Sequence, residues 1–142
     1  VVFLYFNFRE HARCFAGDVG AITIAFVQMF MLLQLIGSTG TFKWVLVFLV
    51  YGIDAVVTIV YRIYRKENIF VAHRTHLYQY LANERGISQL VVSLGYGLLQ
   101  LLVNIILIVF LIDAPAWVGV AAVLVMGFAY VGVRAAVRKP AI

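Results

Sequence analysis

Four long stretches of the chain are almost continuously apolar, and polar segments separate them. Their approximate ranges are 19–36, 44–61, 87–111 and 116–133. Each stretch is near the roughly 20 residues that an α-helix needs to cross about 30 Å of hydrocarbon. The short alternating segments typical of a transmembrane β-barrel are not found in the sequence. Because backbone groups in lipid need internal hydrogen-bond partners, the pattern predicts an all-α, polytopic transmembrane helix bundle with four spans.

The segments between these spans differ in length. Residues 37–40 and 113–115 are short turn signals rich in small residues or proline. Residues 62–86 form a longer connection, too polar to span a membrane and long enough to carry a function. Within it, Leu77, Tyr80 and Leu81 recur at helical spacing, which predicts a short amphipathic helix over about 75–84 that rests at the membrane interface. We expect residues 1–142 to form a single integral-membrane domain.

Composition supports a membrane protein and excludes an ordinary soluble domain. Hydrophobic residues make up 65% of the chain and charged residues only 12%, with a mean hydropathy of +1.03, far from the balance of soluble globular domains. Cys14 is the only cysteine, so an internal disulfide is excluded. No cleavable signal peptide is recognisable. Because the chain begins with Val1 and residues 1–6 are typical of the end of an apolar segment, we expect a fragment of a longer protein.

The basic residues predict the orientation of the spans. Of the 11 Lys and Arg residues, only Lys43 falls on the second side if the four helices alternate. Basic residues near short connections are retained in the cytoplasm, so residues before the first span, residues 62–86 and the C-terminus are expected to be cytoplasmic. The net charge of +5 follows from this bias and from attraction to anionic lipid head groups. No basic helix with exposed aromatic residues is present, so we expect no nucleic-acid partner.

Polar side chains occur inside two of the predicted spans. Asp54 lies in the second span, where a carboxylate should face the bundle or a wet cavity, and Thr58, Tyr61 and Arg65 are expected to share its face. For Asp54, packing and chemistry both remain open. The third span carries a stripe expected to make hydrogen bonds to neighbouring helices, formed by Gln89, Ser93, Tyr96, Gln100 and Asn104.

The sequence FAGDVGA places Asp18 between two glycines at the start of the first span. An aspartate at a helix start acts as a cap or interacts with the helix dipole, and the motif alone does not separate this role from metal binding. However, His73, Arg74 and His76 lie in the only long connection on the same predicted face. A carboxylate suits Mg²⁺, which commonly bridges protein carboxylates and substrate phosphates. Basic side chains beside it suit a diphosphate.

Two segments resemble motifs of the polyprenyl-phosphate N-acetylhexosamine-1-phosphate transferases. This family includes bacterial undecaprenyl-phosphate GlcNAc-1-phosphate transferases and phospho-MurNAc-pentapeptide transferases. FNFREHARCFAGDVGA resembles the family's Asn-spacer-Phe-x-Gly-Asp-x-Gly-Ser block at the start of a transmembrane helix. YGIDAVVTIVYRIYRKENIFVAHRTHLYQYL resembles a later block, in which a membrane helix with an Asp leads to a basic loop and a histidine motif. The resemblance covers about residues 3–85.

The resemblance implies a reaction and a set of site residues. The reaction is transfer of an N-acetylaminosugar 1-phosphate from a UDP-sugar to polyprenyl phosphate, with release of UMP. It implies that Asp18 binds the catalytic Mg²⁺, with Mn²⁺ as an alternative, and that His76 is the second catalytic residue. The implied substrate-binding residues are Asn7, Phe15, Gly17, His73 and Arg74. It also implies a bacterial inner membrane location with the active face in the cytoplasm, and membrane lipid as a partner; a homodimer is left open.

The chain departs from the family pattern at several positions. The spacer over 8–14 lacks the usual proline, and Ala21 stands where Ser is common. HRTHLYQ differs from the Asp-Arg-x-His-x-His-His form at three positions, which hold His73, Tyr78 and Gln79. The family's acidic Asp-Asp pair is absent, so we expect the chain to be inactive by itself.

Two alternatives compete with the transferase hypothesis. The first is a polytopic transporter, channel or scaffold component in which Asp54 lies on a conduction or coupling path. The second takes His73 and His76 as haem or metal ligands.

Overall fold

The computed structural model describes residues 2–8, 13–14, 17–71 and 74–137. By its internal contacts the chain forms two compact units, Val1–Val45 and Leu46–Ile142. We describe each unit by itself. The expectation of a single domain stays a prediction.

The first unit contains a short helix and a long one. Helix α1 covers Val2–Asn7 and α2 covers Gly17–Thr39. The predicted turn at 37–40 is shorter in the structure, because α2 continues through Gly37 and Ser38. Gly40 follows the helix with φ of +68°, the left-handed conformation that glycine commonly supplies after a helix C-terminus. Its amide donates to the Ile36 carbonyl at 2.8 Å, which closes the last turn.

The predicted all-α fold with four spans is confirmed. Within the described residues, four helical segments are long and apolar enough to cross a membrane: Gly17–Thr39, Phe42–Tyr64, Gln89–Leu111 and Ala116–Val137. Their bounds lie within a few residues of the predicted ones. No strand occurs in the described ranges. Many of their large apolar side chains are exposed, as expected for helices whose outer surfaces meet lipid rather than water.

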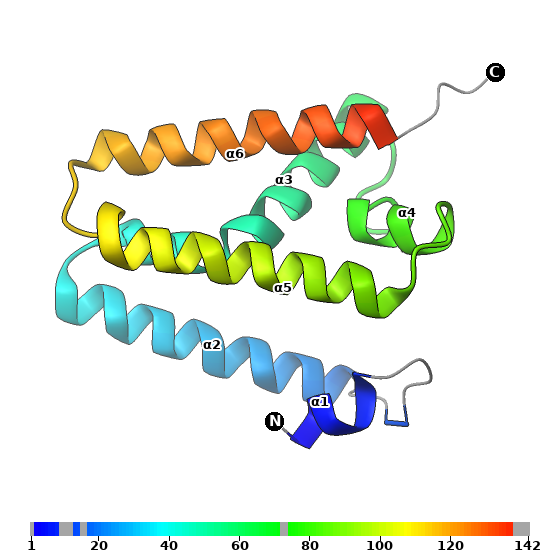
Figure 1. Cartoon of the computed structure of the whole chain (residues 1–142), viewed down its shortest axis with the longest axis horizontal. Helices are drawn as coiled ribbons and strands as arrows, with labels where there is room; N and C mark the ends of the chain where they lie inside the picture. The colour runs from blue at the N-terminus through cyan, green and yellow to red at the C-terminus, as the bar shows by residue number, and fades with distance from the viewer. Residues whose placement is uncertain (1, 9–12, 15–16, 72–73, 138–142) are drawn as a thin grey trace. The chain divides into compact units, whose positions relative to one another are not determined.

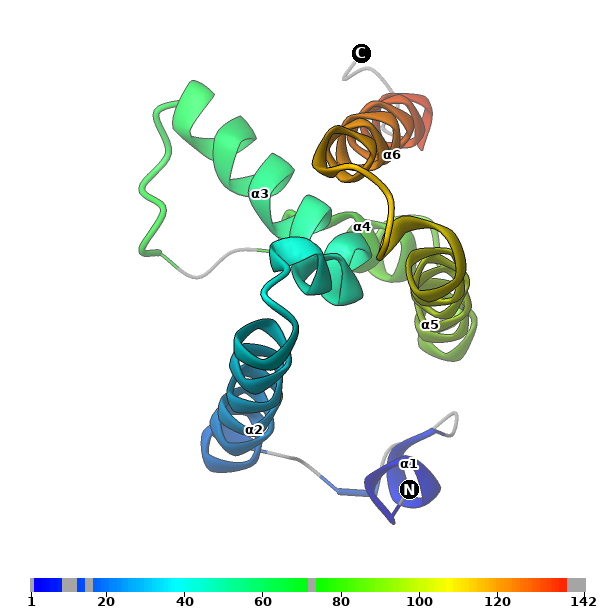
Figure 2. The ribbon, with the colours of Figure 1, turned by 90° about the vertical axis from the view of Figure 1, so that its left-hand side faces the viewer.

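Four helices build the second unit. A 3₁₀ segment over Phe42–Phe48 leads from the first unit into α3 (Leu49–Tyr64), which is followed by α4 (Leu77–Asn83), α5 (Gln89–Ile106), a π-helical turn over Leu107–Leu111, and α6 (Ala116–Val137). Helix α3 packs against both α5 and α6, and α4 packs against α5. Figure 1 shows α3 crossing obliquely between α5 and α6. Figure 2 looks nearly along the axes of α5 and α6 and shows α3 inclined to both, on one side of them.

A side chain of α5 replaces one backbone hydrogen bond of the second span. The Gln100 amide accepts from the Val50 N–H at 2.9 Å and donates to the Leu46 carbonyl at 3.4 Å. These two backbone groups are four residues apart and would bond directly in an α-helix. Gln100 also donates to Asn104 Oδ1 at 2.8 Å. The predicted hydrogen-bonding role of the polar stripe is thus confirmed at Gln100, which satisfies backbone groups where the 3₁₀ segment becomes α3.

The predicted helix over 75–84 is present as the shorter α4. His76 is its N-cap residue, and Leu77 is buried while Tyr80 and Leu81 are half-buried. Gly86, with φ of +67°, lies between α4 and α5. Ser88 then caps α5 by accepting a hydrogen bond from the Val91 N–H at 3.3 Å. These signals define the structure of residues 74–88, the part of the connection that carries His76.

Candidate functional site

The first unit holds three of the predicted site residues within the described ranges. Gly17 begins α2 with φ of +63°, and Asp18 follows it in the first helical turn with an exposed side chain. This position suits both alternatives, because a carboxylate there interacts favourably with the helix dipole and is open to a ligand. Asn7 ends α1, and its Oδ1 accepts from the Cys14 N–H at 3.0 Å, so it ties the connection between α1 and α2. Phe15 lies outside the described residues.

The second unit holds His76 and Arg74, while His73 lies outside the described residues. Arg74 is exposed. His76 is partly buried, with 22% of its side chain accessible. Both residues lie immediately before α4, on the segment that leads from α3.

A cluster of buried and partly buried polar side chains lies where this segment meets α3 and α6. We call it the Asp54 cluster, and it consists of Asp54, Thr58, His76, Tyr130 and Arg134. Asp54 and Thr58 are 2% and 0% exposed, and Arg134 is 5% exposed. Such burial of charge is costly unless hydrogen bonds and opposite charge compensate it.

Hydrogen bonds connect four members of the Asp54 cluster: Asp54, Thr58, Tyr130 and Arg134. Asp54 Oδ1 accepts from Tyr130 Oη, from the Leu77 N–H at 3.1 Å and from Thr58 Oγ1 at 3.5 Å. Arg134 Nη1 donates to Thr58 Oγ1 and to Tyr130 Oη, both at 2.9 Å. Tyr130 and Thr58 therefore link the carboxyl group of α3 to the guanidinium of α6 without a direct ion pair.

A second arginine organises the start of the same connection. Arg62 is 4% exposed and donates to three backbone carbonyls, those of Asn68, Ile69 and Val71. Its Nε also lies 3.4 Å from Glu67 Oε2. Arg62 thereby satisfies carbonyl groups of an irregular segment that contains no regular hydrogen-bond ladder.

The predicted polar face of the second span needs one correction. Thr58 lies on the Asp54 face as predicted, and the Tyr61 ring lies 5.3 Å from the Arg134 guanidinium. Arg65, however, is exposed and pairs with Glu67 at 3.3 Å. Arg62 takes the inward position because steps of four residues from Asp54 keep a side chain on one helix face. We did not predict three of these residues as site residues from the sequence: Arg62, Tyr130 and Arg134. The available signal was a spacing of four residues, between Thr58 and Arg62 and between Tyr130 and Arg134.

His76 is restrained by Asp54 and by a tyrosine. Its Nδ1 lies 3.5 Å from Asp54 Oδ2, an electrostatic contact rather than a short hydrogen bond. The imidazole stacks on the Tyr78 ring, with centroids 5.4 Å apart and an angle of 23° between the planes. Burial, followed by the neighbouring Asp54 and Tyr51, raises the pKa of Tyr78 above its usual 10.0. Tyr78 thus remains a neutral phenol at physiological pH.

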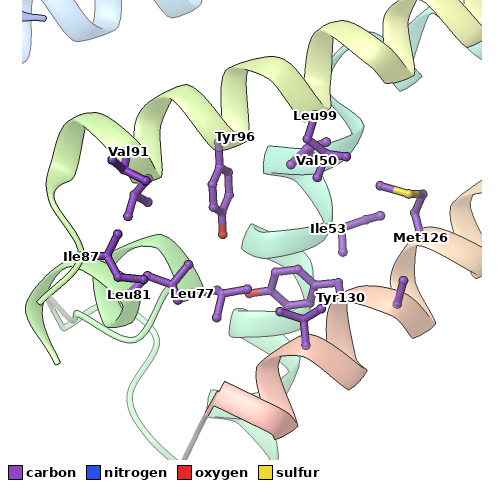
Figure 3. Close-up of a pocket in the computed structure, with 14 residues that line it drawn as sticks. Val50, Ile53, Leu77, Leu81, Ile87, Val91, Tyr96, Leu99, Met126 and Tyr130 are labelled. Carbon is purple, nitrogen blue, oxygen red and sulfur yellow. The ribbon is translucent and has the colours of Figure 1, made fainter. Parts of the chain in front are cut away.

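An apolar cavity of about 440 Å³ lies beside the Asp54 cluster. Residues of α3, α4, α5 and α6 line it, among them Ile53, Leu77, Gly95, Tyr96 and Tyr130. In Figure 3, Tyr96 extends from α5 into this space and the Tyr130 hydroxyl lies near Leu77. Within the part of the chain that the structure describes, the Tyr96 hydroxyl has no hydrogen-bond partner.

A polar cavity, also of about 440 Å³, lies between α4 and α5. Its polar lining comes from six side chains: Arg74, Tyr78, Gln79, Asn83, Gln89 and Ser93. This volume falls within the range of small-molecule sites. The cavity offers a cation, amide groups and hydroxyls for a polar ligand.

The described residues contain no group of three or more His, Cys, Asp and Glu that could hold a metal ion. A magnesium ion often takes only one or two protein carboxylates and completes its shell with water and substrate phosphates. The exposed carboxylate of Asp18 fits one such ligand position. The expected Mg²⁺ site therefore stays a prediction.

Comparison with protein-family models, with curated proteins and with solved structures finds no match to this chain.

Proposed function

We propose that this chain is part of a membrane transferase that moves an N-acetylaminosugar 1-phosphate from a UDP-sugar to a polyprenyl phosphate. The observation that carries the proposal is the placement of His76 and Arg74. Arg74 lines a polar cavity, and His76 lies two residues further along the chain at the start of α4, with 22% of its side chain accessible, in the connection between two apolar helices. Together with the motif around Asp18, this arrangement suits a substrate that joins a polar diphosphate to a lipid phosphate.

The proposed reaction exchanges one phosphorus–oxygen bond for another. An oxygen of the lipid phosphate forms a bond to the phosphorus that carries the sugar. The bond from that phosphorus to the bridging oxygen breaks, and UMP leaves with the electron pair. Both reactants are anions, so preorganised positive charge is expected to supply most of the acceleration. Mg²⁺, when bound, would supply charge neutralisation at the diphosphate.

Residues of the chain have distinct parts in this proposal. Asp18 would hold the metal ion at the start of the first span. Arg74 and His76 would contact the diphosphate, with Arg74 offering a charged donor at the polar cavity. Asn7 would lie in the site for the UDP-sugar. The hydrogen bond that its Oδ1 accepts from the Cys14 N–H would hold its side chain there. The active face would be cytoplasmic in a bacterial inner membrane, and the product would enter synthesis of a cell-envelope glycan.

The test is release of UMP in membranes that carry the complete protein. With UDP-GlcNAc and undecaprenyl phosphate, we expect release that requires both the lipid and Mg²⁺ and that falls at least about 100-fold in His76→Ala. Release without the lipid acceptor would indicate a hydrolase instead. A rate in His76→Ala within a few fold of wild type would overturn the assignment of this residue.

The apolar cavity is the space that we assign to part of the polyprenyl chain, since it adjoins α4 and is bounded by apolar side chains. Gly95 lines it, and a Cβ atom there would meet no atom within 4 Å, so Gly95→Leu fills the cavity without a backbone clash. We expect this change to raise KM for undecaprenyl phosphate about tenfold, the equivalent of about 1.4 kcal/mol, with KM for the UDP-sugar unchanged.

Gly97→Leu is the matched control for the cavity. Gly97 is in the same helix, is exposed and does not line the cavity, and its added Cβ also meets no atom within 4 Å. The gain in helix propensity is the same for both changes. Equal effects of the two substitutions on KM for the lipid would remove the cavity from the proposed substrate path.

A further inference from the structure

Two different spans hold the backbone on either side of His76. On the C-terminal side, the Leu77 N–H donates to Asp54 Oδ1 of α3 at 3.1 Å. On the N-terminal side, the Thr75 carbonyl accepts from Arg134 Nη2 of α6 at 2.9 Å. The residue between these two bonds is His76, so its Cα position is set by side chains far away in the sequence.

The imidazole of His76 is restrained by the same carboxyl group. Asp54 Oδ1 accepts a hydrogen bond from the Leu77 N–H, and Asp54 Oδ2 lies 3.5 Å from His76 Nδ1. The two oxygens of one carboxyl group therefore fix both the backbone and the ring of the His76 segment. Stacking on Tyr78 restricts the ring from a further direction. With 22% of the side chain accessible, part of the imidazole remains open to a ligand.

Helix α4 depends on such tertiary bonds for its position. It has seven residues, and isolated helices shorter than about 12 residues are marginal in water. The N-cap residue His76 makes no side-chain cap of its own. Asp54 supplies instead an acceptor for the first helical N–H group, one of the groups that a helix start leaves unsatisfied.

The presence of charged residues at positions 54 and 134 indicates a role beyond packing. Asp54 and Arg134 are nearly fully buried, and apolar residues of similar volume often stabilise a core as well as buried charge does. Their polar atoms are directed at Thr75, His76 and Leu77, through three contacts with one short segment. Positioning of that segment explains why these costly groups are where they are.

We infer that Asp54 and Arg134 are positioning residues that clamp His76 between α3 and α6 and orient its imidazole toward the substrate. This inference rests on the proposed transfer reaction for its functional part. Its structural part, the clamp on residues 75–77, does not depend on that reaction. The two parts are therefore tested by different measurements on the same variants.

Hydrogen exchange tests the clamp in the complete protein. Asp54→Ala removes the acceptor of the Leu77 N–H, and we expect exchange of the α4 amides to accelerate at least about tenfold, with no change in α5. Asp54→Asn retains an oxygen acceptor for that N–H and changes the partner of the His76 ring, so its α4 exchange should stay near wild type. Unchanged α4 exchange in Asp54→Ala would overturn the clamp.

A double-mutant cycle on UMP release tests the positioning role. Asp54→Asn is expected to lower kcat about tenfold in the wild-type background and less than about twofold in the His76→Ala background, because its effect passes through His76. If Asp54→Asn acted independently of His76, the double variant would show the product of the two single reductions in kcat. That result would overturn the inference. If wild type releases no UMP, the proposed reaction fails, and faster α4 exchange in Asp54→Ala would still support the clamp.

Discussion

Replacement of Asp18 by asparagine is expected to reduce Mg²⁺-dependent release of UMP at least about 100-fold. The change removes the negative charge that would hold the metal ion. The helix would lose only the dipole interaction of the carboxylate, about 0.3–1 kcal/mol, so the start of α2 should form in both proteins. The rate is measured in membranes that carry the complete protein, with Mg²⁺ varied over a wide range.

Asp113→Asn is the matched control for this experiment. It makes the same change of carboxylate to amide in the connection before α6, which the charge distribution assigns to the opposite membrane face. We expect Asp113→Asn to keep the wild-type rate. If Asp18→Asn also stays within a few fold of wild type, Asp18 acts only at the helix start and the proposed metal site is wrong.

Replacement of Arg134 by methionine is expected to lower the free energy of unfolding by about 3–5 kcal/mol, the typical cost of breaking a buried charge network from one side. Methionine has a similar length but cannot donate to Thr58, Tyr130 or the Thr75 carbonyl. Thr58 and Tyr130, which donate to the Asp54 carboxyl group, would lose their hydrogen bonds from the guanidinium. The positive charge that these bonds link to the carboxyl group would be removed. Thermal unfolding in detergent, followed by circular dichroism, measures the loss.

Two further variants show whether the charge network causes this loss. Arg65→Met removes an exposed arginine that pairs with Glu67, and such surface pairs are worth about 0–1 kcal/mol. Arg134→Met combined with Asp54→Asn should be more stable than the sum of the two single changes predicts, because it leaves no unpaired buried charge. Strict additivity, or an equal effect of Arg65→Met, would contradict the network.

The spans could be predicted because hydropathy and length determine them almost alone. Each apolar stretch became a helix, and the differences are confined to the ends. Helix α2 continues through Gly37 and Ser38 because glycine costs only about 1 kcal/mol within a helix, and a turn signal made of small residues does not force the helix to end there.

The Asp54 cluster could be predicted only in part. Asp54 was expected to face the bundle because a carboxylate in a span is costly in lipid. The cluster residues Tyr130 and Arg134 are 76 and 80 positions away from Asp54 in the sequence, and periodicity within one helix does not report which neighbouring helix lies opposite. Arg134 also belongs to the group of basic residues that orientation alone already explains. Only the packing of α3 against α6 reveals its role.

The proposed roles of the binding residues in the first unit require that they act together with residues of the second unit. Neither the sequence pattern nor the packing within one unit determines whether they do. Asp18 and His76 belong to separate units, and their joint action on one diphosphate is the central proposal. The distribution of basic residues supports it, because alternating spans would put both positions on the predicted cytoplasmic side.

Cross-linking of positions 18 and 76 tests that proposal most directly. In the complete protein, with Cys14 and any other cysteine replaced by serine, Asp18→Cys and His76→Cys are introduced together and treated with a short bifunctional thiol reagent. We predict an intramolecular cross-link and labelling of both cysteines from the cytoplasmic face. Labelling of the two positions from opposite faces of the membrane would contradict a shared diphosphate site.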